Sequence, residues 1–232
     1  IARAEDVSRR TAIGKLIMEC GTIGMATILE VAKAAEPSSA SKLLTSVDAP
    51  VSGGPMGAQG GTLAFMVGAN KRATFPTVKA YLSHMSKPDA MFLCSDIGAG
   101  TAFKVISNYL SAIISLAAFE ALNIGSKMGL DVSLLTDVVN VSPGQRWVAR
   151  KSNLVPGMKA NVSSWRGHEG GFRIELCAKV LDMGSRLAGM IGAKTMLDNP
   201  GLEAFNEAMS HERYKGKDVR VVYKWLNESE RK

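Results

Sequence analysis

The sequence predicts an α/β part followed by an all-α part, with the boundary near residue 97. Before that point, short apolar runs that fit β-strands alternate with stretches of helical periodicity. After it the strand pattern fades, and apolar residues recur at helical spacing almost to the end of the chain. Strands that alternate with helices predict βαβ units and a mostly parallel sheet. At 232 residues the chain is short for two full domains and generous for one.

In the first part, Lys15–Cys20 is expected to be a strand, and a turn at 21–24 leads into a helix over 25–35. The composition of 36–41, with Pro37 and three serines, predicts a loop. The remaining elements expected here are a lead-in at 46–50 to a glycine-rich turn, a strand over 62–67, a helix over 72–85 and a strand over 90–94.

In the second part, one long helical pattern covers 101–128 and ends at Gly129. Four shorter helices are expected over 133–140, 170–192, 200–209 and 217–226. The charge-free segment of this helical pattern, Val105–Phe119, is shorter than the roughly 20 apolar residues that cross a bilayer. It is therefore interpreted as a buried helix of a soluble protein, and no membrane association is expected.

The composition is that of an ordinary globular protein, with 46% apolar and 21% charged residues. This excludes a disordered acidic tail, a collagen-like repeat and a disulfide scaffold. The three cysteines and the three histidines are too scattered for a zinc or redox motif, so no metal is expected. The net charge of +7 comes from dispersed cations among few aromatic residues, which makes nucleic-acid binding a weak third choice.

The first motif that could carry chemistry is Asp48-Ala-Pro-Val-Ser-Gly-Gly54. Gly53 and Gly54 can adopt positive φ, and successive N–H groups in such a turn can converge on an anion, with the Ser52 hydroxyl beside them. For a bare Ser-Gly-Gly, a plain tight turn is the favoured interpretation.

The second motif is Gly98-x-Gly100-x-x-x-Lys104-x-x-x-Asn108. Lys104 and Asn108 are four residues apart, so on a helix they project from one face. The residues around them are mostly apolar, which would desolvate the lysine and lower its pKa toward the range of proton transfer. The alternative is a lysine whose stem lies on apolar surface and whose ammonium reaches water. Gly98 and Gly100 are interpreted as permitting close approach of the chain to a ligand.

Together these motifs resemble the β-hydroxyacid dehydrogenases, as does Gly61-Thr-Leu-x-Phe-Met-Val-Gly68. Downstream stretches narrow the likeness to 3-hydroxyisobutyrate dehydrogenase in order and spacing. They are Glu120–Asp131, Trp147, Val155–Gly157, Gly170–Phe172 with Lys179, and Lys217-Asp218.

The resemblance implies a truncated Rossmann-type domain followed by a long helix and an all-α domain used in dimerisation. It implies NAD- or NADP-dependent oxidation of a β-hydroxyacid to a semialdehyde, a step of valine degradation, with NAD favoured. By this likeness Lys104 is the acid/base and Asn108 positions the substrate. Ser52, Gly53 and Gly54 hold the substrate carboxylate, and Thr22 and Lys179 contact the cofactor. A small β-hydroxyacid, a homodimer or higher homo-oligomer, and the mitochondrial matrix (otherwise the cytoplasm) complete these expectations.

Departures from the family pattern keep alternatives open. The family's glycine-rich phosphate turn is not present before residue 98, so the N-terminal part of the Rossmann-type domain is expected to be missing and the chain by itself inactive. Ser107 precedes the motif asparagine and argues against 6-phosphogluconate dehydrogenase, while Val180 stands where the family has Asp. The alternatives are another family member, such as tartronate semialdehyde reductase, and a non-catalytic remnant that mainly dimerises.

Overall fold

The structure, a computed structural model, describes residues 15–40, 44–145 and 162–229, and the side chains of 36–40 are excluded from the description. The chain divides into two compact units, residues 1–107 and 108–232. The long helix α5 (Ala99–Lys127) begins in the first unit and continues into the second. The predicted domain boundary at residue 97 stays a prediction.

The first unit contains a five-stranded mixed sheet. Its strands are β1 (Lys15–Glu19), β2 (Leu44–Asp48), β3 (Val51–Ser52), β4 (Leu63–Gly68) and β5 (Ser86–Ser95). β1 pairs in parallel with β2, and β4 in parallel with β5. The two halves meet in antiparallel fashion, because both β2 and β3 run against β4. The sheet is therefore mostly parallel, as expected, and the antiparallel junction was not predicted from the sequence.

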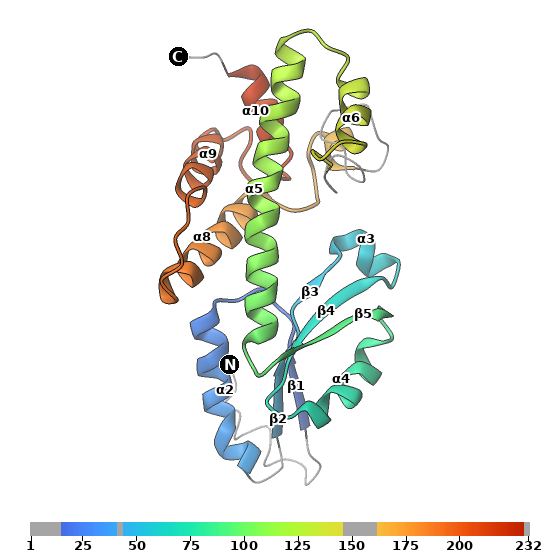
Figure 1. Ribbon diagram of the computed structural model, residues 1–232, viewed down its shortest axis with the longest axis vertical. Helices are drawn as coiled ribbons and strands as arrows, with labels where there is room; N and C mark the ends of the chain where they lie inside the picture. Colours follow the sequence, from blue (N-terminus) through green and yellow to red (C-terminus); the bar gives the residue numbers. More distant parts are fainter. Residues whose placement is uncertain (1–14, 41–43, 146–161, 230–232) are drawn as a thin grey trace. The chain divides into compact units, whose positions relative to one another are not determined.

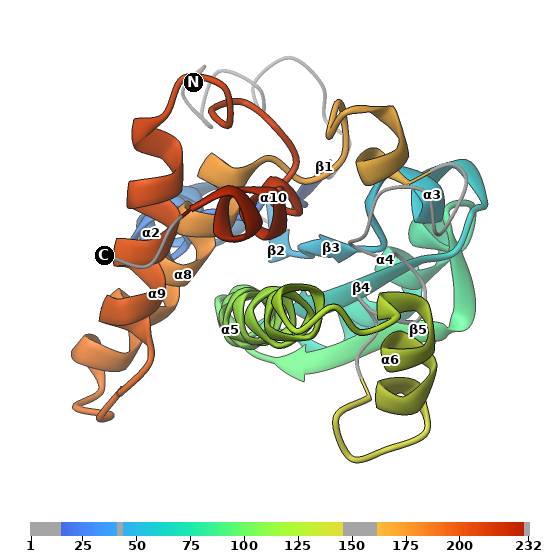
Figure 2. The ribbon, with the colours of Figure 1, turned by 90° about the horizontal axis from the view of Figure 1, so that it is seen from above.

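Helices cover the two sides of this sheet. α2 (Met25–Ala40) packs against β2, and α4 (Phe75–Leu82), preceded by the 3₁₀ turn η1 (Arg72–Thr74), packs against β5 on the opposite side (Figures 1 and 2). β1, α2 and β2 thus form one βαβ unit. The buried side chains between these layers include Val47, Phe65, Val67, Val78 and Leu82.

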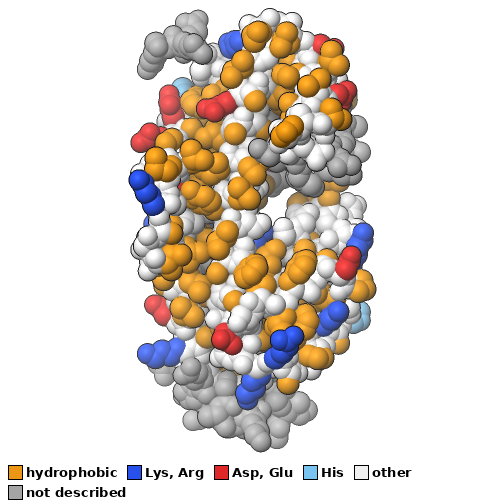
Figure 3. All heavy atoms as spheres, in the orientation of Figure 1, with side chains coloured by type: hydrophobic (Ala, Val, Ile, Leu, Met, Phe, Trp, Pro, Cys, Tyr) orange, Lys and Arg blue, Asp and Glu red, His pale blue; other side chains and the backbone are white. Residues whose placement is uncertain are grey.

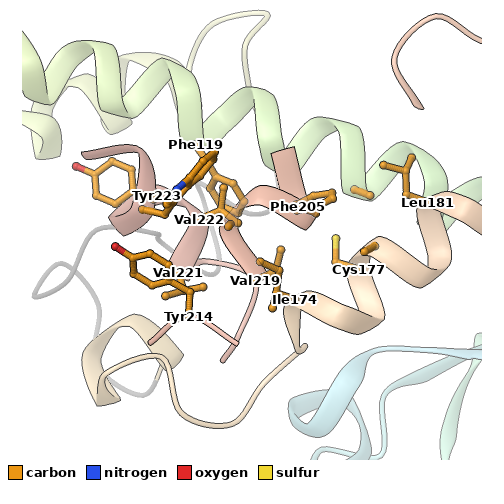
Figure 4. Close-up of a cluster of buried hydrophobic side chains, with 14 of the residues drawn as sticks. Phe119, Ile174, Cys177, Leu181, Phe205, Tyr214, Val219, Val221, Val222 and Tyr223 are labelled. Carbon is orange, nitrogen blue, oxygen red and sulfur yellow. The ribbon is translucent and has the colours of Figure 1, made fainter. Parts of the chain in front are cut away.

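The second unit is helical in the part that the structure describes. Besides α5, it contains α6 (Val132–Asn140), the 3₁₀ turn η2 (Ser163–Arg166), α8 (Ile174–Met190), α9 (Asp198–Ser210) and α10 (Val221–Glu228). Side chains from α5, α8, α9 and the segment around α10 converge in one core (Figure 4). Phe119, Ile174, Leu181, Phe205 and Val222 are fully buried there.

The α/β-plus-all-α class predicted from the sequence is confirmed, and several element boundaries are corrected. Residues 36–40 of the predicted loop at 36–41 are the last turn of α2, and residue 41 lies outside the described residues. The alanines before Pro37 propagate the helix, and one proline removes only one of its hydrogen bonds. A short helix, α3 (Gly54–Gln59), replaces the predicted glycine-rich turn. α8 begins at Ile174 rather than 170, since Gly170 and Gly171 have φ of +72° and +79°.

The helix α5 is less buried than the sequence predicts. By length and composition alone it could cross a bilayer, and only 28% of its most apolar window is buried. One stripe is buried and includes Thr101, Lys104, Val105, Ala112 and Phe119. Another stripe exposes large apolar side chains. Hydrophobic side chains also gather over the end of α5 and over α6, where Ile124, Met128, Leu134 and Val138 are exposed (Figure 3).

The start of α5 is held by a buried aspartate at the end of β2. Asp48 is fully buried, and its carboxylate accepts hydrogen bonds from the backbone amides of Gly98 (2.8 Å) and Thr101 (2.6 Å). These amides belong to the first turn of α5 and its approach, where a helix has N–H groups without internal partners and favours negative charge. Two glycines make room for the carboxylate: a Cβ on Gly68 would collide with Asp48, and one on Gly100 with the Met66 carbonyl oxygen.

Substituting alanine for Gly100 is expected to destabilise the first unit by about 2–3 kcal/mol, because the added methyl group has no space between α5 and β4. The matched control is Gly189→Ala in α8, where nothing lies within 4 Å of the new Cβ. That change should leave stability unchanged or raise it by up to about 1 kcal/mol. Urea unfolding of both variants measures the difference, and equal midpoints would contradict this account of Gly100.

Candidate active site

The segment that follows Asp48 carries the Ser-Gly-Gly motif. Ser52 is the last residue of β3 and is half-buried, and its pairing with Ala64 of β4 fixes its backbone. Gly53 and Gly54 are exposed and have φ of +135° and +60°, conformations that side-chain-bearing residues rarely adopt. A hydroxyl and two exposed glycine amides therefore lie in succession at the end of this strand, as an anion-binding turn requires.

The chain also leaves the sheet beside this segment at the loop that carries the candidate Thr22. It lies in the loop between β1 and α2, and β1 and β2 are parallel neighbours whose ends are joined by a hydrogen bond from the Ala49 amide to the Glu19 carbonyl oxygen (2.8 Å). In open α/β sheets, ligands bind outside the carboxyl ends of parallel strands. Because Asp48 also holds the start of α5, the loop of Thr22, the Ser52 segment and that helix all begin from one edge of the sheet.

Lys104 lies on the buried stripe of α5, one turn after Thr101. The residue is 7% exposed, and burial lowers the pKa of its ammonium group. In the part of the chain that the structure describes, no carboxylate forms an ion pair with it. The predicted desolvation and its direction are thus confirmed. The desolvation of Lys104 does not come from all of its apolar neighbours in sequence, because two of them, Ile106 and Leu110, are themselves exposed.

Asn108 follows Lys104 by one helical turn within the continuous helix α5. It is half-buried and is the first residue of the second unit. The helical spacing places Asn108 and Lys104 on the same side of α5, so an uncharged donor and acceptor accompanies the desolvated lysine.

The two glycines of the second motif have a different role from the one predicted. The amide of Gly98 binds Asp48, and Gly100 allows α5 to approach β4 and the Asp48 carboxylate. The close approach that these glycines permit is therefore between helix and sheet, rather than between the chain and a ligand. The spacing identified the motif, but sequence reasoning missed the residue that it serves. A lone aspartate at the end of an apolar strand was the available signal.

Lys179 lies on α8 in the second unit and is exposed. Its neighbours Cys177, Ala178 and Leu181 are buried in the core of that unit, so they fix the rotation of α8 and the face that carries Lys179. Val180, which departs from the family pattern, is buried. No role was predicted from the sequence for Asp218, a fully buried aspartate that contacts the segment before α8.

Within the described ranges, no three His, Cys, Asp or Glu side chains are grouped as metal ligands would be. The arrangement instead offers a desolvated amine for proton transfer, hydroxyl and amide groups for an anion, and a loop at the carboxyl end of a parallel strand.

Comparison with known proteins identifies the family of the chain. Residues 98–226 match the model described as the NAD-binding domain of NADP-dependent 3-hydroxyisobutyrate dehydrogenase. Residues 1–99 match the NAD-binding domain of 6-phosphogluconate dehydrogenase.

Curated relatives point to the same family. A probable mitochondrial 3-hydroxyisobutyrate dehydrogenase from Dictyostelium discoideum is 36% identical over 93% of this chain and 65% of its own length. The Pseudomonas aeruginosa enzyme is 34% identical over 93% of this chain and 70% of its own length. The human mitochondrial enzyme is 32% identical over 98% of this chain and 65% of its own length. The chain thus spans slightly less than two thirds of the Dictyostelium and human proteins.

Among solved structures, 3-hydroxyisobutyrate dehydrogenase from Mycobacterium tuberculosis, described with L-serine, superposes with a TM-score of 0.82 at 28% identity. The match covers 96% of this chain and 73% of that one. The resemblance drawn from the sequence motifs is confirmed. The chain belongs to the 3-hydroxyisobutyrate dehydrogenase family.

Proposed function

We propose that the protein containing this chain is an NAD(P)-dependent dehydrogenase that oxidises 3-hydroxyisobutyrate or a close β-hydroxyacid to its semialdehyde. The observation that carries the proposal is Lys104, an amine 7% exposed whose pKa is lowered by burial. A surface lysine remains protonated near neutral pH and cannot accept a proton, whereas a desolvated lysine has a larger neutral fraction.

The residues present fit a nicotinamide cofactor on the side of the sheet where such ligands bind. Thr22 and its neighbours supply a hydroxyl and loop amides at the carboxyl end of β1, beside the start of α5. Lys179 of the second unit is the further cofactor contact. NAD(P), when bound, supplies the acceptor for the hydride that leaves the hydroxyl-bearing carbon. NAD is proposed as the preferred form by family likeness.

Neutral Lys104 accepts the proton of the substrate hydroxyl at Nζ as the hydride leaves the carbon that bears this hydroxyl. The C–O single bond then becomes the carbonyl. In the reverse direction the ammonium returns that proton to the carbonyl oxygen. Asn108, one turn away, positions the substrate through its amide without adding a charge that would oppose the lowered pKa of Lys104.

The substrate carboxylate is assigned to Ser52 with Gly53 and Gly54. The hydroxyl and the exposed glycine amides donate hydrogen bonds, which are strengthened by the negative charge of the carboxylate. This assignment requires a carboxylic acid as substrate. The end of the substrate away from the carboxylate would be selected by residues other than Ser52, Gly53 and Gly54. L-serine, named with the M. tuberculosis structure, is itself a β-hydroxyacid.

A homodimer or higher homo-oligomer is proposed from the uncovered apolar surface of the second unit. Ile124 and Met128 of α5 and Leu134 and Val138 of α6 are each more than half exposed. Exposed apolar side chains that gather in one region, as these do, mark an association site in soluble proteins (Figure 3). The compartment is proposed to be the mitochondrial matrix where the source is eukaryotic, since the Dictyostelium and human relatives are named mitochondrial, and the cytoplasm otherwise.

Replacing Lys104 by methionine in the full-length protein is expected to lower kcat for hydroxyacid oxidation by about 10²–10⁴ through loss of the proton acceptor. In the parent, the rate should rise with pH as Lys104 loses its proton, and this limb should disappear in the variant. Steady-state kinetics across pH 6–10 measure both effects. Lys127→Met, at the far end of the same helix, is the matched control and should retain the pH profile. A Lys104 variant within twofold of the parent would refute the proposed role.

Substituting alanine for Ser52 should raise KM for the hydroxyacid about 10- to 100-fold, the effect of losing a hydrogen bond worth about 1.5–3 kcal/mol to a charged group. KM for the cofactor should stay within twofold, because Ser52 is assigned to the carboxylate alone. Ser83→Ala, an exposed helix-end serine, controls for a general loss of hydroxyl groups. The reverse pattern, with only the cofactor KM raised, would assign Ser52 to the cofactor.

Introducing a charge with Leu134→Glu should shift the protein toward monomers at micromolar concentration, since burying an unpaired carboxylate in an apolar interface is costly. Sedimentation velocity gives the distribution, and Glu203→Gln on α9 is a surface control. A parent that sediments as a monomer would contradict the proposed self-association.

A further inference from the structure

A second buried aspartate, Asp218, lies between α9 and α10 and has no part in the site described above. Its residue is 0% exposed, and its Oδ1 accepts hydrogen bonds from the Arg220 amide (3.0 Å) and from Nη1 of the same arginine (2.6 Å). Nη1 of Arg220 also donates to the Ser163 hydroxyl (3.0 Å), which ties the pair to η2. The charge of Asp218 is thus satisfied by a guanidinium that is itself largely buried.

The other half of this carboxylate holds the residues that lead into α8. Oδ2 of Asp218 accepts a hydrogen bond from the amide of Phe172 (2.8 Å), and the backbone amide of Asp218 donates to the His168 carbonyl oxygen (2.9 Å). A short antiparallel bridge continues the contact on both sides. In it the Val219 amide binds the Phe172 carbonyl oxygen at 2.8 Å, and the Ile174 amide binds the Lys217 carbonyl oxygen at 2.9 Å.

The glycines before Phe172 are shaped for this contact. Gly170 and Gly171 have positive φ, and a Cβ on Gly171 would collide with Oδ2 of Asp218. Gly170-Gly-Phe172 therefore forms a turn that closes around a carboxylate of the same chain, and these glycines are not available to close around a ligand.

α8 begins two residues after Phe172, at Ile174, which is fully buried. Its first turn has one more tie to the segment before Asp218, since Glu175 Oε1 accepts a hydrogen bond from the Gly216 amide (2.6 Å). Lys179 lies five residues after Ile174 on the same helix. Because a helix is stiff over this distance, its point of origin determines where the base of the Lys179 side chain stands.

We propose that Asp218, with Arg220, is a positioning residue for Lys179: it fixes the origin of α8 and so the reach of the lysine toward the cofactor. This inference rests on the cofactor role of Lys179 in the proposed function. Small displacements of a contacting group weaken its interaction steeply. Loss of the Asp218 contacts should therefore weaken cofactor binding through Lys179, even though Asp218 itself does not touch the cofactor.

The test is a double-mutant cycle in the full-length protein, read by fluorescence titration of NADH so that turnover is not needed. Asp218→Asn keeps the size of the side chain but turns an acceptor into a donor that faces the Phe172 amide or Arg220. It is expected to weaken NADH binding about tenfold. Lys179→Met should weaken NADH binding by at least as much, and the double variant should bind no more weakly than Lys179→Met alone.

The matched control is Asp198→Asn. Asp198 is also buried in the second unit, and its Oδ2 accepts hydrogen bonds from Ser185 and Thr195 (both 2.8 Å), away from the start of α8. It should lower the melting temperature and leave the Kd of NADH within twofold. If Asp218→Asn does not fold, Arg220→Lys replaces it in the cycle. That variant keeps a cation but loses the fixed guanidinium contacts, with a weakening of about threefold expected.

Asp218→Asn with an unchanged Kd would overturn the proposal. So would equal weakening by Asp218→Asn in the parent and in the Lys179→Met background, since additive effects mean that Asp218 does not act through Lys179. A parent that binds no NADH would overturn it together with the cofactor assignment. A parent that binds NADH but oxidises no β-hydroxyacid would defeat the proposed function alone and leave the cycle readable.

Discussion

The buried carboxylate of Asp48 connects the sheet of the first unit to the helix that carries the candidate acid/base. It ends β2, accepts the amides of Gly98 and Thr101, and thereby sets the point from which α5 starts. Burying a charge is costly unless it is hydrogen-bonded, so the contact is stable only because the first turn of a helix offers amides without partners. Ser52 follows Asp48 by four residues and Lys104 follows Thr101 by three, so both candidate groups are placed from this contact.

The second unit uses the same solution at the start of α8. Asp218 is fully buried, accepts a backbone amide from the approach to that helix, and requires a glycine at the point of closest contact. The two sites differ in how the charge is balanced, because Asp48 binds the first turn of a helix while Asp218 forms an ion pair with Arg220. In both units a helix that carries a candidate functional lysine begins at an aspartate with no access to solvent.

The fold class was predictable because strand-length apolar runs and long helical periodicity are local properties of a sequence. The buried environment of Lys104 was predictable for the same reason, from its place in a long apolar helix. The antiparallel junction of β3 and β4 was not, since it depends on pairing between segments that local patterns do not encode. The helix through Pro37 and the roles of Gly100 and Gly171 also escaped prediction. A glycine's function depends on the atom that approaches it, here Met66 or Asp218, and that atom is distant in sequence.

Asp48 holds the start of α5 and Lys104 is the proposed acid/base, and this difference affects how related sequences are interpreted. Asp48, Gly68 and Gly100 maintain the architecture, whereas the proton-transfer role is assigned to a single lysine. A paralogue that keeps Asp48, Gly68 and Gly100 but replaces Lys104 would retain the same backbone and still match the family in a search. Such a protein would have the fold of a dehydrogenase but would bind its ligand without catalysing the reaction. Only the residue at position 104 would distinguish it from an active enzyme.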